Sequence, residues 1–159
     1  MGKNIDEERL IIAAFPELAN DNHFLITSNS TPNYNCIAWA YNCNDRWMWP
    51  KTGNYQYIDG YHFWPDDEIQ DESVEHFIEA FKLKGYEICD YGPFDLKYRR
   101  IALYVKHGTN QCTHASRELR NGFWTSKLGD KNDIQHESPF TIQGNSYGVV
   151  HCIMRMRFE

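Results

Sequence analysis

The chain has 159 residues, of which 42% are hydrophobic and 24% charged, and its formal net charge is −6. That length suits one domain with its own hydrophobic core, and this composition is that of a folded globular protein rather than a disordered one. The acidic balance, without any lysine- or arginine-rich run, argues against binding to nucleic acid. No apolar run approaches the ~18–20 residues that a membrane helix needs, so we expect no membrane span.

The amino-terminal residues and the cysteine count indicate a compartment. Residues 1–8 are polar and acidic, so we expect no signal peptide. The five cysteines are an odd number, which indicates free thiols in a reducing environment. We therefore expect a cytoplasmic protein, with export that requires no cleaved signal as the alternative.

The first half of the chain predicts helices. Residues 6–15 place their apolar side chains on one helical face before Pro16. Residues 27–35 are turn formers and predict an ordered loop, after which Cys36 opens a helix of about two turns. Residues 45–72 show little periodicity and are predicted to be an irregular, aromatic-rich insertion. Residues 72–84 form the clearest helix, because their apolar residues follow the helical period and Gly85 comes next.

The second half predicts strands, over residues 101–105, 112–119, 123–128 and 147–158. The dipeptide Asn121-Gly122 is a strong signal for a two-residue hairpin turn between the second and third of them. Residues 147–158 alternate apolar and polar side chains, as a half-buried strand does. The expected fold is a single α+β domain over residues 1–159, with amino-terminal helices and a four-stranded antiparallel sheet in the second half.

Cys36 is the candidate nucleophile. A polar loop leads to it, and it begins an apolar helix, where unpaired backbone N–H groups and the helix dipole stabilise a thiolate and could hold an oxyanion. The alternative is that Cys36 is a small buried hydrophobic residue, which is common for a free cysteine.

His114 is the candidate base for Cys36, because a strand holds its side chain rigidly; a purely structural histidine is the alternative. A third group must orient the imidazole. With a two-residue turn, Ser126 points away from His114, although a one-residue shift in register would bring it back. Asp133 lies just beyond the strand end and is the preferred orienting residue, with Ser126 as the alternative.

A cysteine at a helix start, a histidine on a following strand and the Ser126-Lys127-Leu128-Gly129 stretch together resemble papain-like cysteine hydrolases, especially bacterial domains and toxin modules of that group. The resemblance covers about residues 33–40 and 101–156. It implies a papain-like fold with Cys36 as nucleophile and His114 as base. The papain pattern has an asparagine on the third strand and a glutamine ahead of the nucleophile. This sequence has neither, and Asn33 or Asn35 would supply the oxyanion donor.

Aromatic residues are concentrated next to Cys36. Ten of the 24 aromatic residues lie between Tyr34 and Trp64. They either fill a loop-rich core, as we expect for Trp39, or line a substrate groove. For Trp47, Trp49 and Trp64 both interpretations stay open, and these three are the candidate substrate-binding residues.

No metal or cofactor is expected. A zinc site could be drawn from the cysteines and histidines, but no Cys-x-x-Cys pair occurs, and phosphate-binding glycine motifs are absent. The sequence therefore predicts a cysteine hydrolase (a peptidase, amidase or deamidase) acting on an amide bond in a protein, peptide or peptidoglycan. The alternative is a catalytically inactive binding module that uses an aromatic groove.

Overall fold

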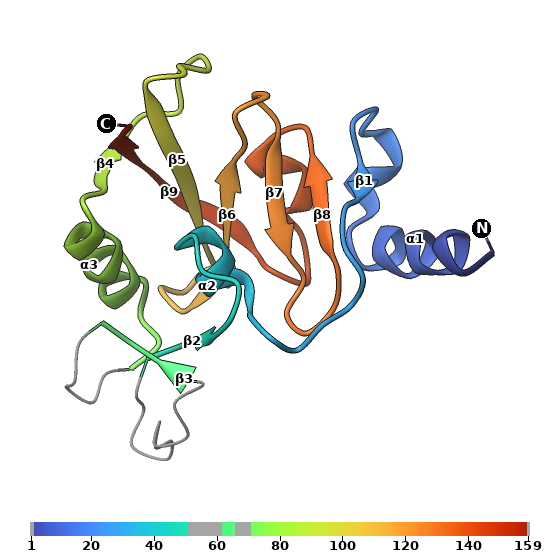
Figure 1. The fold of residues 1–159 in the computed structure, drawn as a ribbon, viewed down its shortest axis with the longest axis horizontal. Helices are drawn as coiled ribbons and strands as arrows, with labels where there is room; N and C mark the ends of the chain where they lie inside the picture. Colours follow the sequence, from blue (N-terminus) through green and yellow to red (C-terminus); the bar gives the residue numbers. More distant parts are fainter. Residues whose placement is uncertain (1, 51–61, 66–70, 159) are drawn as a thin grey trace.

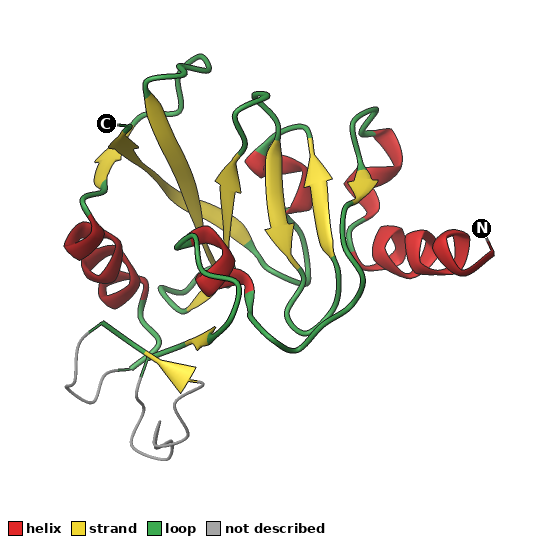
Figure 2. Ribbon diagram, viewed as in Figure 1, coloured by secondary structure: helices red, strands yellow, loops and turns green. Residues whose placement is uncertain are grey.

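The computed structural model describes residues 2–50, 62–65 and 71–158, and one antiparallel sheet dominates it (Figures 1 and 2). The strands, in their order across the sheet, are β1 (Leu25–Ile26), β8 (Asp133–His136), β7 (Trp124–Lys127), β6 (Cys112–Glu118), β5 (Tyr98–Val105), β9 (Val149–Arg157) and β4 (Glu87–Cys89). A separate parallel pair joins β2 (Trp47–Met48) to β3 (His62–Phe63). The two longest strands, β5 and β9, are neighbours near one end of the sheet.

Helices pack against both faces of the sheet. The helices are α1 (Gly2–Ala14), η1 (Pro16–Asn20), α2 (Cys36–Ala40), α3 (Val74–Lys84) and η2 (Pro139–Ile142), of which η1 and η2 are 3-10 helices. Figure 1 shows α2 in front of the sheet, α3 at the left below β4, and α1 at the right beyond β8 and β1, with the two termini at opposite ends. The expected helix over 72–84 is confirmed, and Gly85 ends it in the left-handed conformation with φ 113°.

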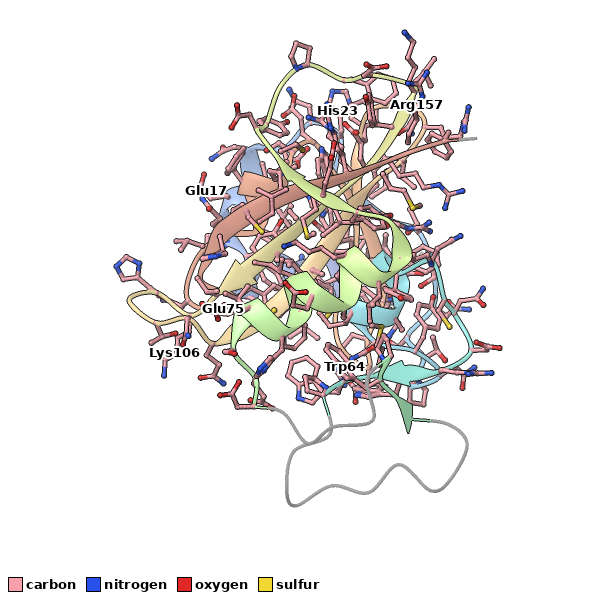
Figure 3. All side chains as sticks on the ribbon, turned by 90° about the vertical axis from the view of Figure 1, so that its left-hand side faces the viewer. Glu17, His23, Trp64, Glu75, Lys106 and Arg157 are labelled. Carbon is pink, nitrogen blue, oxygen red and sulfur yellow. The ribbon has the colours of Figure 1, made fainter. Side chains whose placement is uncertain are left out.

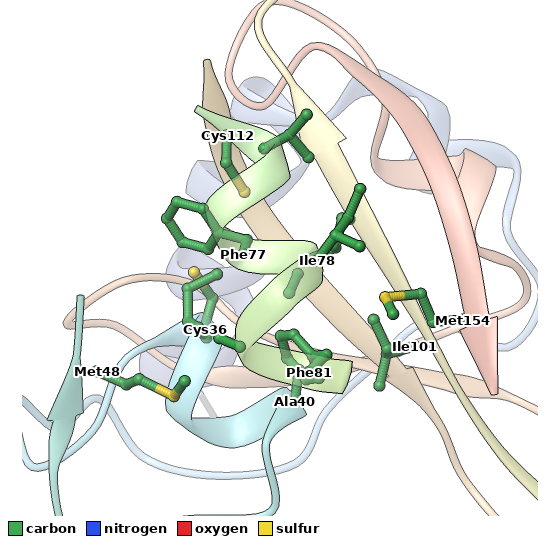
Figure 4. Packing of buried hydrophobic residues seen from close by; sticks show 14 of the residues in the cluster. Cys36, Ala40, Met48, Phe77, Ile78, Phe81, Ile101, Cys112 and Met154 are labelled. Carbon is green, nitrogen blue, oxygen red and sulfur yellow. The ribbon is translucent and has the colours of Figure 1, made fainter. Parts of the chain in front are cut away.

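Two hydrophobic clusters divide the core between the faces. On one face, apolar residues of β5 and β6 pack against α2 and α3; Figure 4 shows Phe77 and Phe81 of α3 among them. On the other face, Tyr104 and Trp124 pack against Ile11 of α1 and Phe15, which follows it. Because successive side chains of a strand point to opposite faces, both clusters are built from the same central strands. The sheet is therefore covered on both sides.

The expected papain-like arrangement, with amino-terminal helices followed by a four-stranded sheet, is wrong. The sheet has seven strands, and β1 and β4 come from the first 89 residues, between the helices. The three unpredicted strands, β1, β4 and β8, contain two, three and four residues. Runs this short carry no readable alternation of apolar and polar residues.

The hairpin between β6 and β7 also differs from the expectation. Arg117 pairs with Thr125 and Glu118 with Trp124, one residue away from the register of a two-residue turn. Residues 120–122 form the turn instead, closed by the Leu119 N–H donating to the Phe123 carbonyl at 2.7 Å, with Gly122 at φ 88°. Three-residue hairpin loops with a left-handed glycine are a common alternative. The shift reverses which face each β7 side chain occupies.

The expected insertion over residues 45–72 falls partly outside the described residues, since 51–61 and 66–70 are not described. Its described parts include β2 and β3. In the described ranges, no helix combines the length and the hydrophobicity that crossing a membrane requires.

Candidate functional site

Asn35 fixes the loop that presents Cys36. Its Oδ1 accepts hydrogen bonds from the N–H groups of Ala38 and Met48, both at 3.1 Å, and its Nδ2 donates to the Met48 carbonyl at 2.8 Å. The side chain therefore caps α2 and ties it to β2, with both lone pairs of Oδ1 in use. This leaves Asn35 poorly placed to be an oxyanion donor. Asn33 lies exposed in the loop before it.

The Cys36 sulfur is buried against β6, close to the point where β6 and β7 stop pairing. These strands pair only at the turn end of the hairpin, and Ala115, farther along β6, packs in the same cluster as Cys36. The side chain is only 6% exposed. Burial raises the pKa of the Cys36 thiol to about 11, although the N–H groups of Ala115, Ile37 and Cys36 itself and the charge of Lys127 oppose this. The resting thiol is therefore protonated at neutral pH.

His114 is fully buried on the face that α1 covers. Its ring stacks on the Tyr147 ring, with centroids 3.9 Å apart and 5° between the planes, and Tyr104 lies on the same face. Neither ring nitrogen has a hydrogen-bond partner among the described residues, so no bond joins His114 to Cys36 or Asp133. Burial lowers the pKa of His114 well below its ordinary value, and His136 adds to the effect.

Tyr147 separates His114 from an apolar groove. The groove lies between α1, the loop that follows β7 and the turn that precedes β9. The groove has a volume of about 540 Å³, and its walls include Leu10, Ile11, Phe15, Leu128 and Tyr147. Tyr147 is close enough to Cys36 for a thiolate there to raise its pKa further, beyond the larger effect of burial. The groove, Tyr147 and His114 thus lie in sequence from the surface inward.

Asp133 faces Tyr34 rather than His114. The Tyr34 hydroxyl donates to Asp133 Oδ2 at 2.5 Å, whereas Oδ1 is buried without a partner in the described part of the chain. Burial raises the pKa of Asp133, and the bond from Tyr34 and the charge of Lys127 oppose that rise. Asp133 pairs in register with Lys127, on the α2 face of the sheet. The structure therefore does not bring Asp133 and His114 together as an orienting pair.

Lys127 is fully buried and holds the loop before Cys36 in place. Its Nζ donates to the carbonyls of Thr31 and Gly129, at 2.7 and 2.6 Å, and lies 4.9 Å from the centre of the Tyr34 ring. Burial lowers its pKa, and Asp133 and Cys36 oppose this. A lysine in a short strand gives no sequence signal of burial, because lysine is almost never fully buried unless paired.

Ser126 is bonded to a different histidine from the expected one. Its Oγ lies 2.8 Å from His136 Nε2, and His136 Nδ1 lies 2.7 Å from the Ser138 carbonyl. Since a carbonyl only accepts, Nδ1 carries the proton and Ser126 donates to Nε2. Both side chains are fully buried. Burial lowers the pKa of His136 to about 4.

The candidate tryptophans belong mainly to the core. Trp49 and Trp64 both pack edge-on against Phe77, with ring centroids 5.2 and 5.1 Å apart, and Figure 3 shows Trp64 beneath α3. The Trp49 indole also donates to Glu72 at 2.6 Å. Trp47 lies half-buried in β2. The packing of Trp49 and Trp64 leaves them unsuited to stacking on a substrate.

Across residues 2–50, 62–65 and 71–158, the cysteines and histidines do not gather around a metal position. All five cysteines are free thiols. Among the described residues, no group of three or more histidine, cysteine, aspartate or glutamate side chains is arranged to hold a metal ion.

The fold and the site define a mainly β domain with a buried cysteine and a buried histidine on opposite faces of a covered sheet. The chain belongs to the family described as "Domain of unknown function (DUF7689)", whose model matches residues 25–155. No curated protein and no solved structure matches the chain. The matched range contains Cys36, His114 and Tyr147, whereas α1, which forms one wall of the groove, lies outside it.

Proposed function

We propose that this protein is a cysteine-dependent hydrolase of amide bonds, with Cys36 as nucleophile and His114 as general base. The observation that carries the proposal is the environment of His114, a fully buried imidazole whose two nitrogens have no partner among the described residues. Its neighbour Ala115 packs with Cys36 on the α2 face, so the imidazole must turn from the opposite face of β6 to reach the sulfur. An unpartnered buried polar group destabilises a fold. Such a group in the same domain as a buried thiol therefore supports a chemical role.

The protonation states suit general-base catalysis. The raised pKa of Cys36 keeps the thiol neutral, and the lowered pKa of His114 keeps the imidazole free to accept a proton. In the proposed reaction, His114 takes the thiol proton as the sulfur attacks the amide carbonyl. His114 then gives that proton to the leaving amine, and water hydrolyses the resulting thioester to release the acid and the thiol.

Substrate access in this proposal runs through the groove beside α1. Tyr147 must turn away from His114 to open the site, and the apolar walls around Leu10 and Phe15 suit a hydrophobic segment of a protein or peptide better than a glycan. Tyr147 would then act as a cover that keeps water from the pair at rest. Five free thiols support a reducing compartment, and we propose the cytoplasm.

A non-catalytic binding domain is the second candidate. It is favoured by the burial of both reactive groups, since Cys36 is 6% exposed and His114 is 0% exposed. In this case the groove binds its partner and the buried thiol serves only as packing.

Thiol alkylation followed by peptide mapping tests the site. In the wild-type protein at neutral pH we expect Cys36 to label more slowly than half-buried Cys43, because its thiol is buried and protonated. Tyr147→Ala removes the cover and should accelerate labelling of Cys36, while that of Cys43 stays the same. Unchanged labelling of Cys36 in Tyr147→Ala would contradict the proposed access route.

Turnover of a panel of peptide amides tests the reaction itself. We expect Tyr147→Ala to keep or raise turnover, and Cys36→Ala and His114→Gln to abolish it, with Cys43→Ala as the matched control. Turnover that survives in Cys36→Ala rejects the nucleophile. Binding of peptides without turnover, unaffected by Cys36→Ala, selects the non-catalytic alternative.

A further inference from the structure

A second pocket, lined largely by arginines, lies at the other end of α2. It has a volume of about 180 Å³ and sits where the end of α2, the start of β5 and the β6–β7 turn meet the carboxyl-terminal Phe158. Its charged lining residues are Arg99, Arg100, Arg117, Arg120 and Glu118. The whole chain carries a net charge of −6, so the positive charge of this pocket is opposite in sign to the charge of the protein as a whole.

Arg100 is the one arginine of these four that pairs with a carboxylate of the described residues. Arg100 forms a two-point ion pair with Glu118, at 2.8 and 2.6 Å, and this pair is almost fully buried. Within the described residues, no carboxylate lies within ion-pair distance of Arg99, Arg117 or Arg120. Three guanidinium charges therefore share the pocket without a balancing carboxylate from the part of the chain that the structure describes.

The three guanidiniums are held in place by aromatic rings instead. Those of Arg99 and Arg120 lie 4.6 and 4.5 Å from the centre of the Phe158 ring, and that of Arg117 lies 4.1 Å from the Trp39 ring. Cation–π packing positions a guanidinium without using its N–H donors. Arg117 donates one hydrogen bond, from Nη1 to Asn42 Oδ1. Its buried Nε has no partner in the described part of the chain.

The closely spaced cations lower the pKa values of neighbouring basic groups. Burial lowers the pKa of Arg117, and the charge of Arg99 lowers it further. The pKa of Lys84 is lowered in the same way, first by burial and then by Arg99 and Arg117. An anion in the pocket would relieve this repulsion.

We propose that this pocket binds the phosphate group of a small phosphorylated compound. A phosphate carries about −1.5 to −2 charges and three or more acceptor oxygens, which matches three unpaired guanidiniums better than a single carboxylate does. The volume suits a phosphate with a compact organic group, and the rings of Phe158 and Tyr86 provide an apolar wall for that group.

Calorimetric titration of the full chain with inorganic phosphate and with glycerol 3-phosphate, at constant ionic strength, tests the proposal. We expect saturable binding at one site and a rise in the melting temperature, as for any ligand that binds only the native state. Tighter binding of glycerol 3-phosphate assigns the site to phosphate esters, and tighter binding of the free ion assigns it to inorganic phosphate. No binding of either, or an equal stabilisation by sodium chloride, overturns the proposal.

Two double variants distinguish the pocket from a general charge effect. Arg99→Gln/Arg120→Gln should weaken binding by about tenfold or more for each guanidinium lost, while its melting temperature without ligand stays equal or rises. Arg9→Gln/Lys106→Gln removes the same charge from exposed positions outside the pocket and should leave the affinity unchanged. Equal weakening in both variants rejects the pocket as the site.

Discussion

Ser126 and His136 form a fully buried pair in which the serine donates to a neutral imidazole. Neutrality is imposed by the surroundings, since burial lowers the pKa of His136 to about 4 and that of His114 well below its ordinary value. An unfolded histidine titrates near 6.5. As the pH falls, the unfolded chain therefore takes up these protons before the native state does, which destabilises the native state.

Acid should consequently weaken the fold over a defined range. The His136 contribution is complete above about pH 6.5 and declines to about pH 4, which amounts to about 3 kcal/mol of unfolding free energy. Urea denaturation at several pH values measures this loss. The variant Ser126→Ala/His136→Leu removes both partners and should show a shallower decline, because one of the two buried histidines no longer contributes. An equally steep decline in the variant would mean that His136 is not the source.

The strand β9 begins beside a tight turn that depends on one glycine. Gly144 and Gly148 exchange backbone hydrogen bonds of 2.9 and 2.8 Å and so close the loop that carries Tyr147. Gly148 has φ 80°, and a Cβ atom there would lie 2.0 Å from the Val105 carbonyl oxygen. Both the backbone conformation and the close approach of β5 therefore require glycine.

Comparing alanine substitutions at two glycines separates the effect of the left-handed backbone from the effect of the steric clash with β5. Gly148→Ala should destabilise the protein by about 3 kcal/mol or more, because it combines a left-handed backbone with a steric clash. Gly108→Ala is the matched control, since Gly108 has φ 77° but open space around its Cβ position, and should cost only about 1–2 kcal/mol. Thermal and urea denaturation provide the comparison. Similar losses in both variants would show that β5 yields to the added methyl group.

At the scale of elements, the sequence predicts what periodicity and turn signals encode. The helix α3 follows from its apolar spacing and Gly85, and the long strands β5 and β9 follow from their apolar content and alternation. The hairpin register does not follow, because Asn121-Gly122 suits both a two-residue and a three-residue turn. Because of this one-residue difference, the two-residue register assigns Ser126 to the wrong face of the sheet. Its hydrogen bond to His136 could therefore not be predicted.

For the candidate site, the sequence indicates the local setting of Cys36 but not how the candidate residues are arranged in space. Cys36 does begin a helix after a polar loop, but α2 has only five residues, so individual N–H groups rather than a helix dipole act on the sulfur. The roles of Tyr147 and Lys127 could not be read from the chain, because they depend on contacts between residues far apart in sequence. The same is true of the arginines around Phe158.

Across the whole molecule, stability should be greatest in the middle of the sheet. The strand β5 lies between β6 and β9 and contributes residues to both hydrophobic clusters. In contrast, β1 and β4 are the outermost strands and contain two and three residues. Amide protection rises with burial and with the number of paired neighbours.

Hydrogen exchange measured by mass spectrometry tests this ranking. Peptides from β5 should exchange most slowly, those from β9 and β6 next, and those from β1 and β4 fastest. Fast exchange in β5 would contradict a single cooperative core shared by both faces of the sheet. Adding phosphate should slow exchange at the start of β5 if the arginine pocket binds it, and should leave β1 unaffected.

The short outer strands have a further consequence for how copies of this protein behave in concentrated solution. An incoming β-strand of another molecule can extend a sheet only by pairing with free backbone groups along an edge. Here the edges β1 and β4 are two and three residues long, while the eight- and nine-residue strands β5 and β9 lie inside. The sheet therefore offers little template for edge-to-edge aggregation, even though its interior strands are rich in apolar residues.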